Sequence, residues 1–248
     1  MKKLYSIIMK LVLMATALSI TACGGNDEES RGQENPSSFG KRLIRVTSDN
    51  YTKEYFYDSE GRVIQIERTN NSTGSKMVVE AFEYDDNSIV ETIFDDGFSY
   101  QKKYTLENGK IKKIYDGDTK NSFEYNYKNG YLITETKSNQ RKLDYYWTDG
   151  NLMRVEYENE RTIETYEYTN YICPQGFFPF GRYADICRLW GLSGLLGKTM
   201  KNLPSKYTGD EYTEIYDWLI QDGLPIMLIC TYNEKNRYNQ RAYKFDWL

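Results

Sequence analysis

Apolar and polar residues alternate along most of the chain from Leu43 to Tyr168, in short runs separated by polar turns. Between residues 98 and 106, for example, every second residue falls on one face: Phe98, Tyr100, Lys102, Tyr104 and Leu106. Ser99, Gln101 and Lys103 fall on the other face. A period of two residues is typical of a strand with one face half buried. The pattern therefore predicts strands throughout this region.

An internal repeat organises these strands. Each copy has an aromatic residue, a second large apolar residue two positions later, a polar turn, and an apolar residue that opens the next strand. The copies begin at Tyr55, Phe82, Tyr104, Tyr125, Tyr145 and, in degenerate form, Tyr166. The turn residues Gly109, Gly130 and Gly150 are 21 and 20 residues apart, which leaves room for two strands and two turns. Asn or Asp beside Gly suits the positive φ of tight hairpin turns.

The repeat predicts an all-β protein, an antiparallel up-and-down meander of about 12–15 strands that forms a curled sheet or a closed barrel. Closure would remove the exposed sheet edges. A membrane barrel needs an outward face that is apolar over most of each strand. Here Ile111 and Lys113 share one face, and Lys112 and Ile114 share the other. We therefore expect a soluble barrel.

The meander is interrupted at residues 171–206. Residues 182–196 predict a short amphipathic helix, with Ile186, Leu189 and Leu196 among its apolar positions. An apolar stripe usually packs into a core, which favours a plug against the open end of the sheet. The alternative is an exposed insertion that binds a partner or controls access of a ligand. A hairpin at 212–220 and 224–232 and a last strand at 241–248 complete the sheet.

The first residues of the chain are typical of an export signal. Lys2 and Lys3 precede an apolar run from Leu11 to Ile20, which is too short to span a bilayer. Small residues then lead to Cys23, and this arrangement resembles a bacterial lipobox. The resemblance implies that residues 1–22 are removed and that Cys23 carries lipid and anchors the protein to a membrane. We expect residues 23–38 to be a flexible acidic linker and residues 39–248 to form one β-domain.

Composition excludes several functions. Removal of residues 1–22 takes three lysines and lowers the formal charge from −4 to −7, which argues against binding to nucleic acid. The chain has no histidine, so it lacks histidine-based catalysis and histidine metal sites, and we expect neither cofactor nor metal. The 24 tyrosines suit a wide sheet with half-buried faces.

The three cysteines that follow Cys23 leave two interpretations open. A disulfide between Cys173 and Cys187 would close a short loop, and a native disulfide typically contributes about 2–4 kcal/mol. Alternatively all three, Cys230 included, are small buried apolar residues. For Cys230 we favour burial, because it ends the apolar run that begins at Pro225.

The chain also resembles two groups of known proteins. The stretch from Tyr55 to Arg62 resembles the tyrosine–aspartate repeat of secreted shell and adhesion proteins, but later copies replace Arg62. The whole chain resembles an uncharacterised family of Bacteroidota lipoproteins with a porin-like barrel. The acidic cluster after Cys23 resembles the export signal of lipoproteins on the cell surface of these bacteria. These resemblances imply an outer-membrane location and transfer no catalytic residue.

Three functions follow. In a glycan- or small-ligand-binding module, Trp147, Trp190 and Trp218 would stack on the ligand, although cross-strand packing explains most of the aromatic residues. In the alternative, a structural component of an outer-membrane complex, the contact is with an envelope protein. The third function, a carboxylate glycosidase, would use pairs such as Asp85 and Asp86. Because aspartates at turns are expected for backbone reasons, we predict that the protein is not an enzyme.

Overall fold

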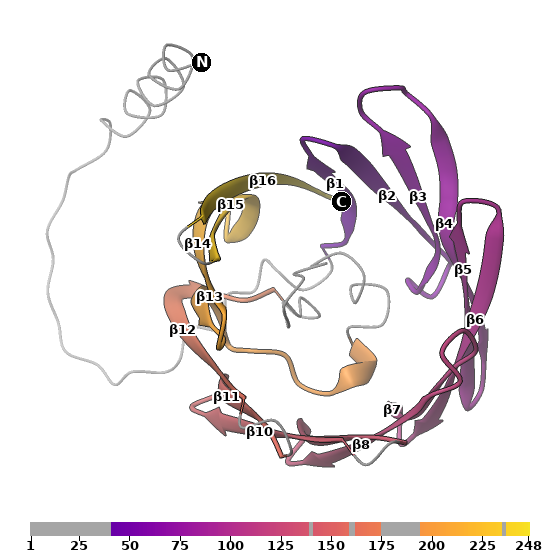
Figure 1. The fold of residues 1–248 in the computed structure, drawn as a ribbon. Helices are drawn as coiled ribbons and strands as arrows, with labels where there is room; N and C mark the ends of the chain where they lie inside the picture. Colours follow the sequence, from indigo (N-terminus) through magenta and orange to yellow (C-terminus); the bar gives the residue numbers. More distant parts are fainter. Residues whose placement is uncertain (1–40, 139–140, 159–161, 175–193, 235–236) are drawn as a thin grey trace, which may run out of the picture. The chain divides into compact units, whose positions relative to one another are not determined.

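A computed structural model describes residues 41–138, 141–158, 162–174, 194–234 and 237–248. These residues form sixteen strands that close into one antiparallel barrel in chain order (Figure 1). The strands are β1 Leu43–Ser48, β2 Tyr51–Tyr57, β3 Val63–Asn70, β4 Lys76–Asp85, β5 Ser88–Asp95, β6 Phe98–Glu107, β7 Lys110–Asp116, β8 Ser122–Lys128, β9 Tyr131–Lys137, β10 Lys142–Thr148, β11 Asn151–Tyr157, β12 Ile163–Ile172, β13 Asn202–Thr208, β14 Tyr212–Gln221, β15 Leu224–Glu234 and β16 Arg237–Trp247.

The predicted meander is confirmed, and it closes. The barrel has sixteen strands, one more than the upper end of the expected range. The tight turns also have the predicted chemistry. Asn108, Asn129, Asp149 and Asp222 have φ between 50° and 54°, and each precedes a glycine with φ between 70° and 86°. Such pairs of positive φ values match the twist of a hairpin.

The two ends of the barrel differ. We call one end the base; it carries the turns at 58–62, 86–87, 108–109, 129–130, 149–150 and 222–223, whereas the two-residue turns at 49–50 and 96–97 lie at the other end. The barrel's first and last residues also meet there, through Arg42 N–H to Leu248 O at 3.0 Å and Leu248 N–H to Arg42 O at 2.8 Å. The opposite end, where the remaining hairpins turn, is called the loop end below.

A bulge lies near the base in seven of the eight odd-numbered strands. The pairing register shows one extra residue in each; these residues are Ile44, Ile64, Lys112, Ile133, Met153, Ser205 and Ile226. A bulge interrupts the ladder of backbone hydrogen bonds and bends the strand. At each bulge the chain therefore bends and backbone groups need other partners.

Those partners are the second aromatic residues of the repeats and of two further aromatic pairs, Tyr216–Trp218 and Phe245–Trp247. A Tyr hydroxyl or Trp indole N–H from the next even strand donates to a carbonyl beside each bulge, over 2.5–2.8 Å. We call this set the base girdle; its donors are Tyr57, Tyr84, Tyr127, Trp147, Tyr168, Trp218 and Trp247. The first aromatic residue of the pairs, such as Tyr55 or Tyr125, is instead buried, except that Tyr145 is half-buried. The aromatic-x-aromatic motif thus combines core packing with a bond between hairpins.

Strand β5 is the exception that supports this account. Its pairing with β6 continues without interruption from Ser88 to Asp95, and Leu106 N–H donates to Asn87 O at 2.9 Å. Here Leu106 stands where the other repeats have Tyr or Trp. The donor is absent from the described hairpin that lacks the bulge, so the two features occur together.

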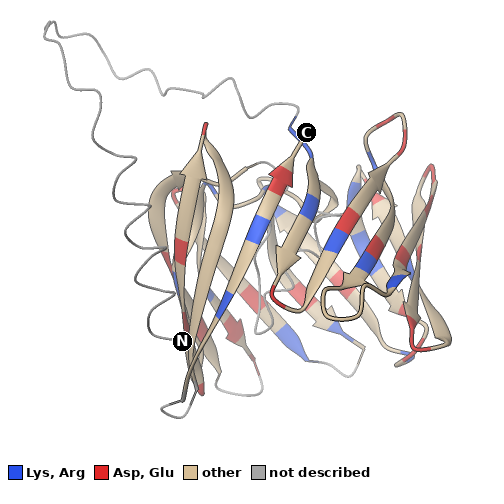
Figure 2. Ribbon diagram, turned by 90° about the horizontal axis from the view of Figure 1, so that it is seen from above, with Lys and Arg blue, Asp and Glu red and all other residues tan. Residues whose placement is uncertain are grey.

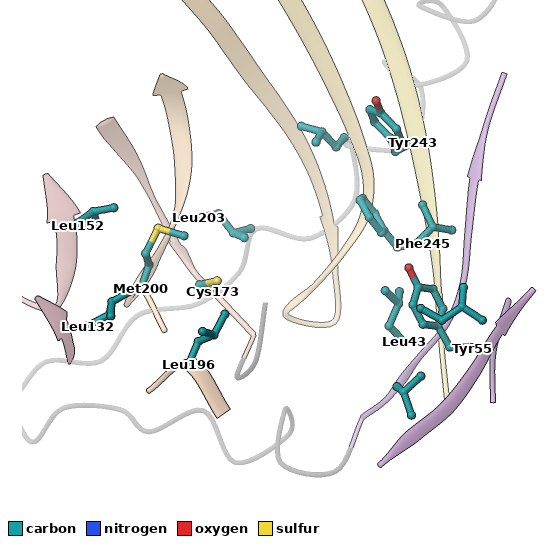
Figure 3. Close-up of a cluster of buried hydrophobic side chains, with 14 of the residues drawn as sticks. Leu43, Tyr55, Leu132, Leu152, Cys173, Leu196, Met200, Leu203, Tyr243 and Phe245 are labelled. Atoms are coloured by element: carbon teal, nitrogen blue, oxygen red, sulfur yellow. The ribbon is translucent and has the colours of Figure 1, made fainter. Parts of the chain in front are cut away.

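An aliphatic ring lines the inside of the base. Every odd strand contributes one inward side chain with at most 9% of its surface exposed. This base ring consists of Leu43, Val63, Ile89, Ile111, Leu132, Leu152, Leu203 and Leu224. Figure 3 shows Leu132 and Leu152 near Met200 and Leu196, which follow β12 in the chain.

Met200 and Leu196 belong to the strap, residues 194–201, which is the described part of the β12–β13 connection. Lys198 N–H donates to Gly130 O at 2.8 Å, and Lys201 N–H donates to Gly150 O at 2.9 Å. The strap therefore runs inside the wall at the base, where it is drawn in orange in Figure 1. Most of the predicted helix at 182–196 lies outside the described residues. Its described end, residues 194–196, is a single 3₁₀ turn.

The outer face carries ion pairs. Glu54 on β2 binds Arg45 on β1 and Lys76 on β4, both at 2.8 Å, and Arg45 also approaches Asp246 on β16 at 3.4 Å. Lys206 and Glu167 pair at 2.8 Å on the other side of the barrel. Figure 2 marks the positions of Lys, Arg, Asp and Glu, which occur along many strands. These charges agree with the predicted absence of a continuous apolar outer face. Separately, the described residues include no helix long and apolar enough to cross a membrane.

Candidate functional site

Above the base, tyrosines and glutamates occupy the inward positions of β9 to β14. Because side chains alternate across a strand, Glu164 and Tyr166 both point inward, and so do Glu214 and Tyr216. We call this set the inner-wall network; it consists of Glu135, Tyr145, Tyr157, Glu164, Tyr166, Tyr207, Tyr212, Glu214 and Tyr216. These residues are buried or half-buried.

Glu164 is the centre of the network. Its carboxylate accepts hydrogen bonds from the Tyr157 hydroxyl at 2.8 Å and from the Tyr166 hydroxyl at 3.4 Å. The Tyr166 ring meets the Tyr207 ring edge to face with centroids 5.3 Å apart, and Tyr207 in turn packs on Tyr212 at 5.2 Å. Side chains from three strands, β11 to β13, therefore meet at one glutamate that is 5% exposed, and Tyr212 of β14 packs behind Tyr207.

Glu214 and Glu135 also accept hydrogen bonds from tyrosine hydroxyls. The Tyr216 hydroxyl donates to Glu214 at 2.5 Å, and the Tyr145 hydroxyl donates to Glu135 at 3.3 Å. Burial raises the pKa of Glu214, against the opposing effects of the Tyr216 bond and of Arg241. Burial also raises the pKa of Glu135, with the Tyr145 bond opposing it. Both carboxyl groups thus keep a proton to higher pH than a solvated glutamate does.

A tyrosine hydroxyl also donates to a buried glutamate on the opposite side of the barrel. On β6 the Tyr104 hydroxyl donates to Glu91 of β5, which is 2% exposed. Two further ionisable side chains on that side, Lys53 and Glu80, are 6% and 5% exposed. A polar middle layer therefore lies above the apolar base on both sides of the interior.

The structure places two of the three predicted tryptophans on the inner wall. Trp147 packs against Tyr131 with ring centroids 4.7 Å apart and the planes tilted by 36°, and its indole N–H donates to Leu132 O. The Trp218 indole N–H donates to Pro204 O. Both indoles belong to the base girdle, so the cross-strand packing that we weighed against ligand binding is present. Trp190 lies outside the described residues.

The predicted roles of the cysteines are only partly tested by the structure. Cys23 and Cys187 lie outside the described residues, so lipidation and the disulfide of Cys173 stay predictions. Cys173 is buried. Cys230 is 2% exposed on β15, as predicted, and burial raises the pKa of its thiol to about 12.

The turn aspartates serve the backbone. Asp116 accepts hydrogen bonds from the N–H groups of Asp118 and Thr119 at 2.9 and 3.2 Å, and Asp85 accepts from Asp86 N–H at 2.9 Å. Asp95 and Asp96 are exposed at the β5–β6 turn. In the part of the chain that the structure describes, no group of three or more Cys, Asp or Glu residues could hold a metal ion.

Sequence reasoning missed the inner-wall glutamates. The available signal was a Glu two positions before an aromatic residue of the repeat, as in Glu164-Thr165-Tyr166 and Glu214-Ile215-Tyr216. In a strand this spacing puts both side chains on the same face. A carboxylate beside a buried Tyr could therefore have been assigned to the interior.

Comparisons with known proteins support the fold. No protein-family model matches the chain, and no curated protein is similar to it in sequence. Among solved structures, a porin-like protein from Bacteroides uniformis is similar over 84% of this chain and 95% of its own, with a TM-score of 0.61 and 15% identity. A porin-like protein from Bacteroides vulgatus is similar over 83% of this chain and 98% of its own, with a TM-score of 0.56 and 14% identity. The chain thus shares the fold of porin-like barrels from Bacteroides.

Proposed function

We propose that this protein is a lipid-tethered barrel of the cell envelope that binds a small polyhydroxylated ligand, such as a glycan, on its inner wall. The observation that carries the proposal is the inner-wall network. Tyrosine rings supply flat apolar faces for a sugar ring, and hydroxyl and carboxylate oxygens supply hydrogen bonds for its hydroxyl groups. Ligand sites typically combine aromatic walls with a few such polar groups.

The barrel's size supports this location. Small barrels of about eight strands are filled by their own side chains, whereas barrels of about sixteen strands enclose more space. The charged outer face supports a barrel that sits in water and is held to the membrane by the lipid on Cys23. The resemblance of residues 1–23 to a lipoprotein signal and the porin-like structural neighbours support an outer-membrane location. The role is non-catalytic, with neither metal nor cofactor.

The alternative, an accessory component of an envelope complex, is favoured by one observation. Ile215 and Leu219 on the outward face of β14 are 47% and 44% exposed, beside Met227 and Ile229 of β15. Exposed apolar side chains on neighbouring strands are typical of a protein contact.

Calorimetry on residues 24–248 with a panel of host and plant polysaccharides tests the proposal. We expect saturable binding that Glu164→Gln weakens by about tenfold, because an altered hydrogen bond to a buried charged group costs of the order of 1.4 kcal/mol. Glu167→Gln is the matched control: it lies three residues away on the same strand, faces outward and pairs with Lys206. A panel without saturable binding, or equal effects of the two variants, would contradict luminal glycan binding.

A further inference from the structure

Three basic side chains point into the barrel from strands that lie outside the inner-wall network. Arg68 of β3 stands two residues after Ile66, which is 0% exposed in the core. Lys53 of β2 is directly opposite Arg68 in the ladder, and Arg241 of β16 stands two residues before buried Tyr243. Because side chains alternate along a strand and opposite residues share a face, all three point inward. We call Lys53, Arg68 and Arg241 the basic sector.

The two arginines of this sector differ from the arginines of the outer face. Outside, Arg45 pairs with carboxylates of two neighbouring strands at 2.8 and 3.4 Å. Inside, the Arg68 guanidinium donates to the Met77 sulfur at 3.7 Å, and the Arg241 guanidinium lies over the Tyr232 ring, 5.1 Å from its centroid. Within the described part of the chain, neither inward arginine forms an ion pair. Arg68 is half-buried and Arg241 is exposed, so both keep N–H donors for an anion.

The charges around this sector do not balance. Lys53 and Arg68 are like charges directly opposite each other, an arrangement in which the two side chains repel. The inward carboxylate on adjacent β4 is Glu80, which is 5% exposed. On the side of β14, burial raises the pKa of Glu214 and Arg241 opposes that shift, so burial disfavours the charge of this second carboxyl group. Three cations thus face two carboxyl groups, and the excess positive charge attracts anions.

Tyrosines stand beside these charges. The Lys53 Nζ atom lies over the Tyr51 ring, 5.9 Å from its centroid, and the Tyr232 ring supports Arg241 in the same way. Both tyrosines are half-buried, so each keeps an accessible part. A guanidinium on an aromatic ring presents a planar fork of donors that matches a carboxylate or a similar oxyanion. The sector therefore combines aromatic groups that suit a sugar with donors that select negative charge.

The spacing of the two arginines favours a ligand with several charges. Arg68 and Arg241 lie on β3 and β16, which are separated by β2 and β1. Neighbouring strands are about 4.8 Å apart, so three spacings place these residues roughly 14 Å apart along the wall. A single carboxylate therefore contacts one arginine, whereas a chain that carries charges on successive sugars contacts both.

We propose that the ligand of the inner wall is an acidic polysaccharide, whose carboxylate or sulfate groups bind Arg68 and Arg241 of the basic sector. Lys53, which is 6% exposed, contributes charge rather than contact. The inference rests on the proposed function, which supplies the sugar, and it adds the charge that the sugar carries.

The test is calorimetry on residues 24–248 with polygalacturonate, hyaluronate and chondroitin sulfate as acidic probes. The methyl ester of polygalacturonate and dextran are the neutral probes, and the ester removes the charge while it retains the sugar. We expect an acidic probe to bind at least about tenfold more tightly than the neutral probes, with an affinity that falls as salt is raised.

Two variants assign the charge to its residues. Arg68→Gln and Arg241→Gln should each weaken binding of the acidic probe by about tenfold, and the double variant by about a hundredfold, because distant sites act independently. Arg154→Gln is the matched control: it removes the same charge from an outward arginine, which pairs with Glu156 at 3.2 Å, and should leave the affinity unchanged.

Melting temperatures show whether each variant is folded. Arg68→Gln should not lower the melting temperature, because it removes a like charge opposite Lys53. Should it nevertheless unfold the protein, Arg241→Gln, on an exposed side chain, carries the comparison with Arg154→Gln.

The outcomes separate this inference from the proposed function. Equal affinities for polygalacturonate and its methyl ester, with no stronger binding of the other acidic probes, would overturn the acidic ligand and leave glycan binding intact. Acidic binding that neither inward variant weakens would overturn the basic sector as its site. Polyuridylate bound as tightly as the acidic polysaccharides would show that charge alone is recognised, and would overturn the saccharide. No saturable binding of any polysaccharide would refute the proposed function and this inference together.

Discussion

The base and the inner-wall network use the same residue type in opposite ways. At the base, Tyr57 and Tyr127 donate to backbone carbonyls beside bulges, so each hydroxyl joins two hairpins. In the network, Tyr157 and Tyr216 donate to carboxylates. A bond to a backbone carbonyl is independent of the neighbouring side chain, and it recurs in seven hairpins. A bond to a glutamate depends on one particular side chain, and it is confined to certain strands.

This difference separates stability from function. The repeated layer closes the barrel, and it combines an aliphatic ring with aromatic donors to backbone carbonyls. The non-repeated layer places ionisable groups where burial is costly, since a buried carboxyl group must be bonded or protonated. Costly polar groups that serve no repeat are typical of functional sites. We therefore assign the fold to the base and propose the network as the ligand site.

The largest effect is expected in the base ring. Leu152→Ala removes a side chain that is 0% exposed and should lower the free energy of unfolding by about 2–5 kcal/mol, because it leaves a cavity. Met153→Ala, its outward neighbour, is expected to cost far less. Urea denaturation of both variants gives the comparison. Equal losses would show that the interior of the base is not the apolar core.

A smaller effect is expected in the base girdle. Tyr127→Phe removes only the hydroxyl that donates to Ile111 O at 2.6 Å, and it should cost about 1–2 kcal/mol, because that carbonyl loses its partner. Tyr115→Phe, on an outward side chain that is 45% exposed, should change the free energy of unfolding little. The same denaturation measurement distinguishes them. A Tyr127→Phe protein as stable as the wild type would show that the girdle does not stabilise the barrel.

The network should make stability depend on pH. The folded pKa values of Glu135 and Glu214 are raised, so the folded state holds more protons than the unfolded state as pH rises above the ordinary value of 4.5. Their contribution to stability is then greatest below that pH and is lost as pH rises through the folded pKa values.

Thermal unfolding from pH 4.5 to pH 8 measures this dependence. The double variant Glu135→Gln, Glu214→Gln should show a melting temperature that falls less with pH than that of the wild type, by a few degrees. Glu54→Gln on the outer face is the control of opposite sign, because Lys76 and Arg45 lower the pKa of Glu54. Identical pH profiles for the double variant and the wild type would contradict raised pKa values in the network.

The smallest effect is expected on the outer face. Lys76→Ala removes the ion pairs with Glu54 and Glu67 and should cost less than about 1 kcal/mol, with the difference shrinking at high salt. Urea denaturation at low and high salt measures it. A loss as large as that of Leu152→Ala would mean that the outer ion pairs support the barrel as much as the base does.

The sequence predicted most of the architecture, because the patterns that indicate strands and turns are local and repeated. Alternation, the Asn-Gly and Asp-Gly turns and the aromatic pairs each lie within one hairpin, so they predicted the meander. Closure was left open, since it depends on contacts between residues far apart in the chain, such as Leu43 with Trp247. The bulges were missed because a single extra residue leaves no clear mark in a mixed strand.

The candidate site was only partly predictable. Trp147 and Trp218 were candidates for a ligand surface, weighed against cross-strand packing. Both lie on the inner wall, and their indole N–H groups donate to backbone carbonyls at the base. Glu164 was not singled out, because its neighbourhood comes from three strands that only the closed barrel brings together. Local patterns indicate which residues face inward, but not which inward residues meet.

The most direct test of this division compares two variants that each lose one hydroxyl, Tyr127→Phe in the base and Tyr157→Phe in the network. For both, the free energy of unfolding and the affinity for a polysaccharide from the calorimetric panel are measured together. We predict that Tyr127→Phe loses more stability and keeps its affinity, whereas Tyr157→Phe loses affinity and keeps more of its stability. Equal losses of affinity in the two variants, or no saturable binding by the wild type, would contradict the assignment of binding to the inner wall.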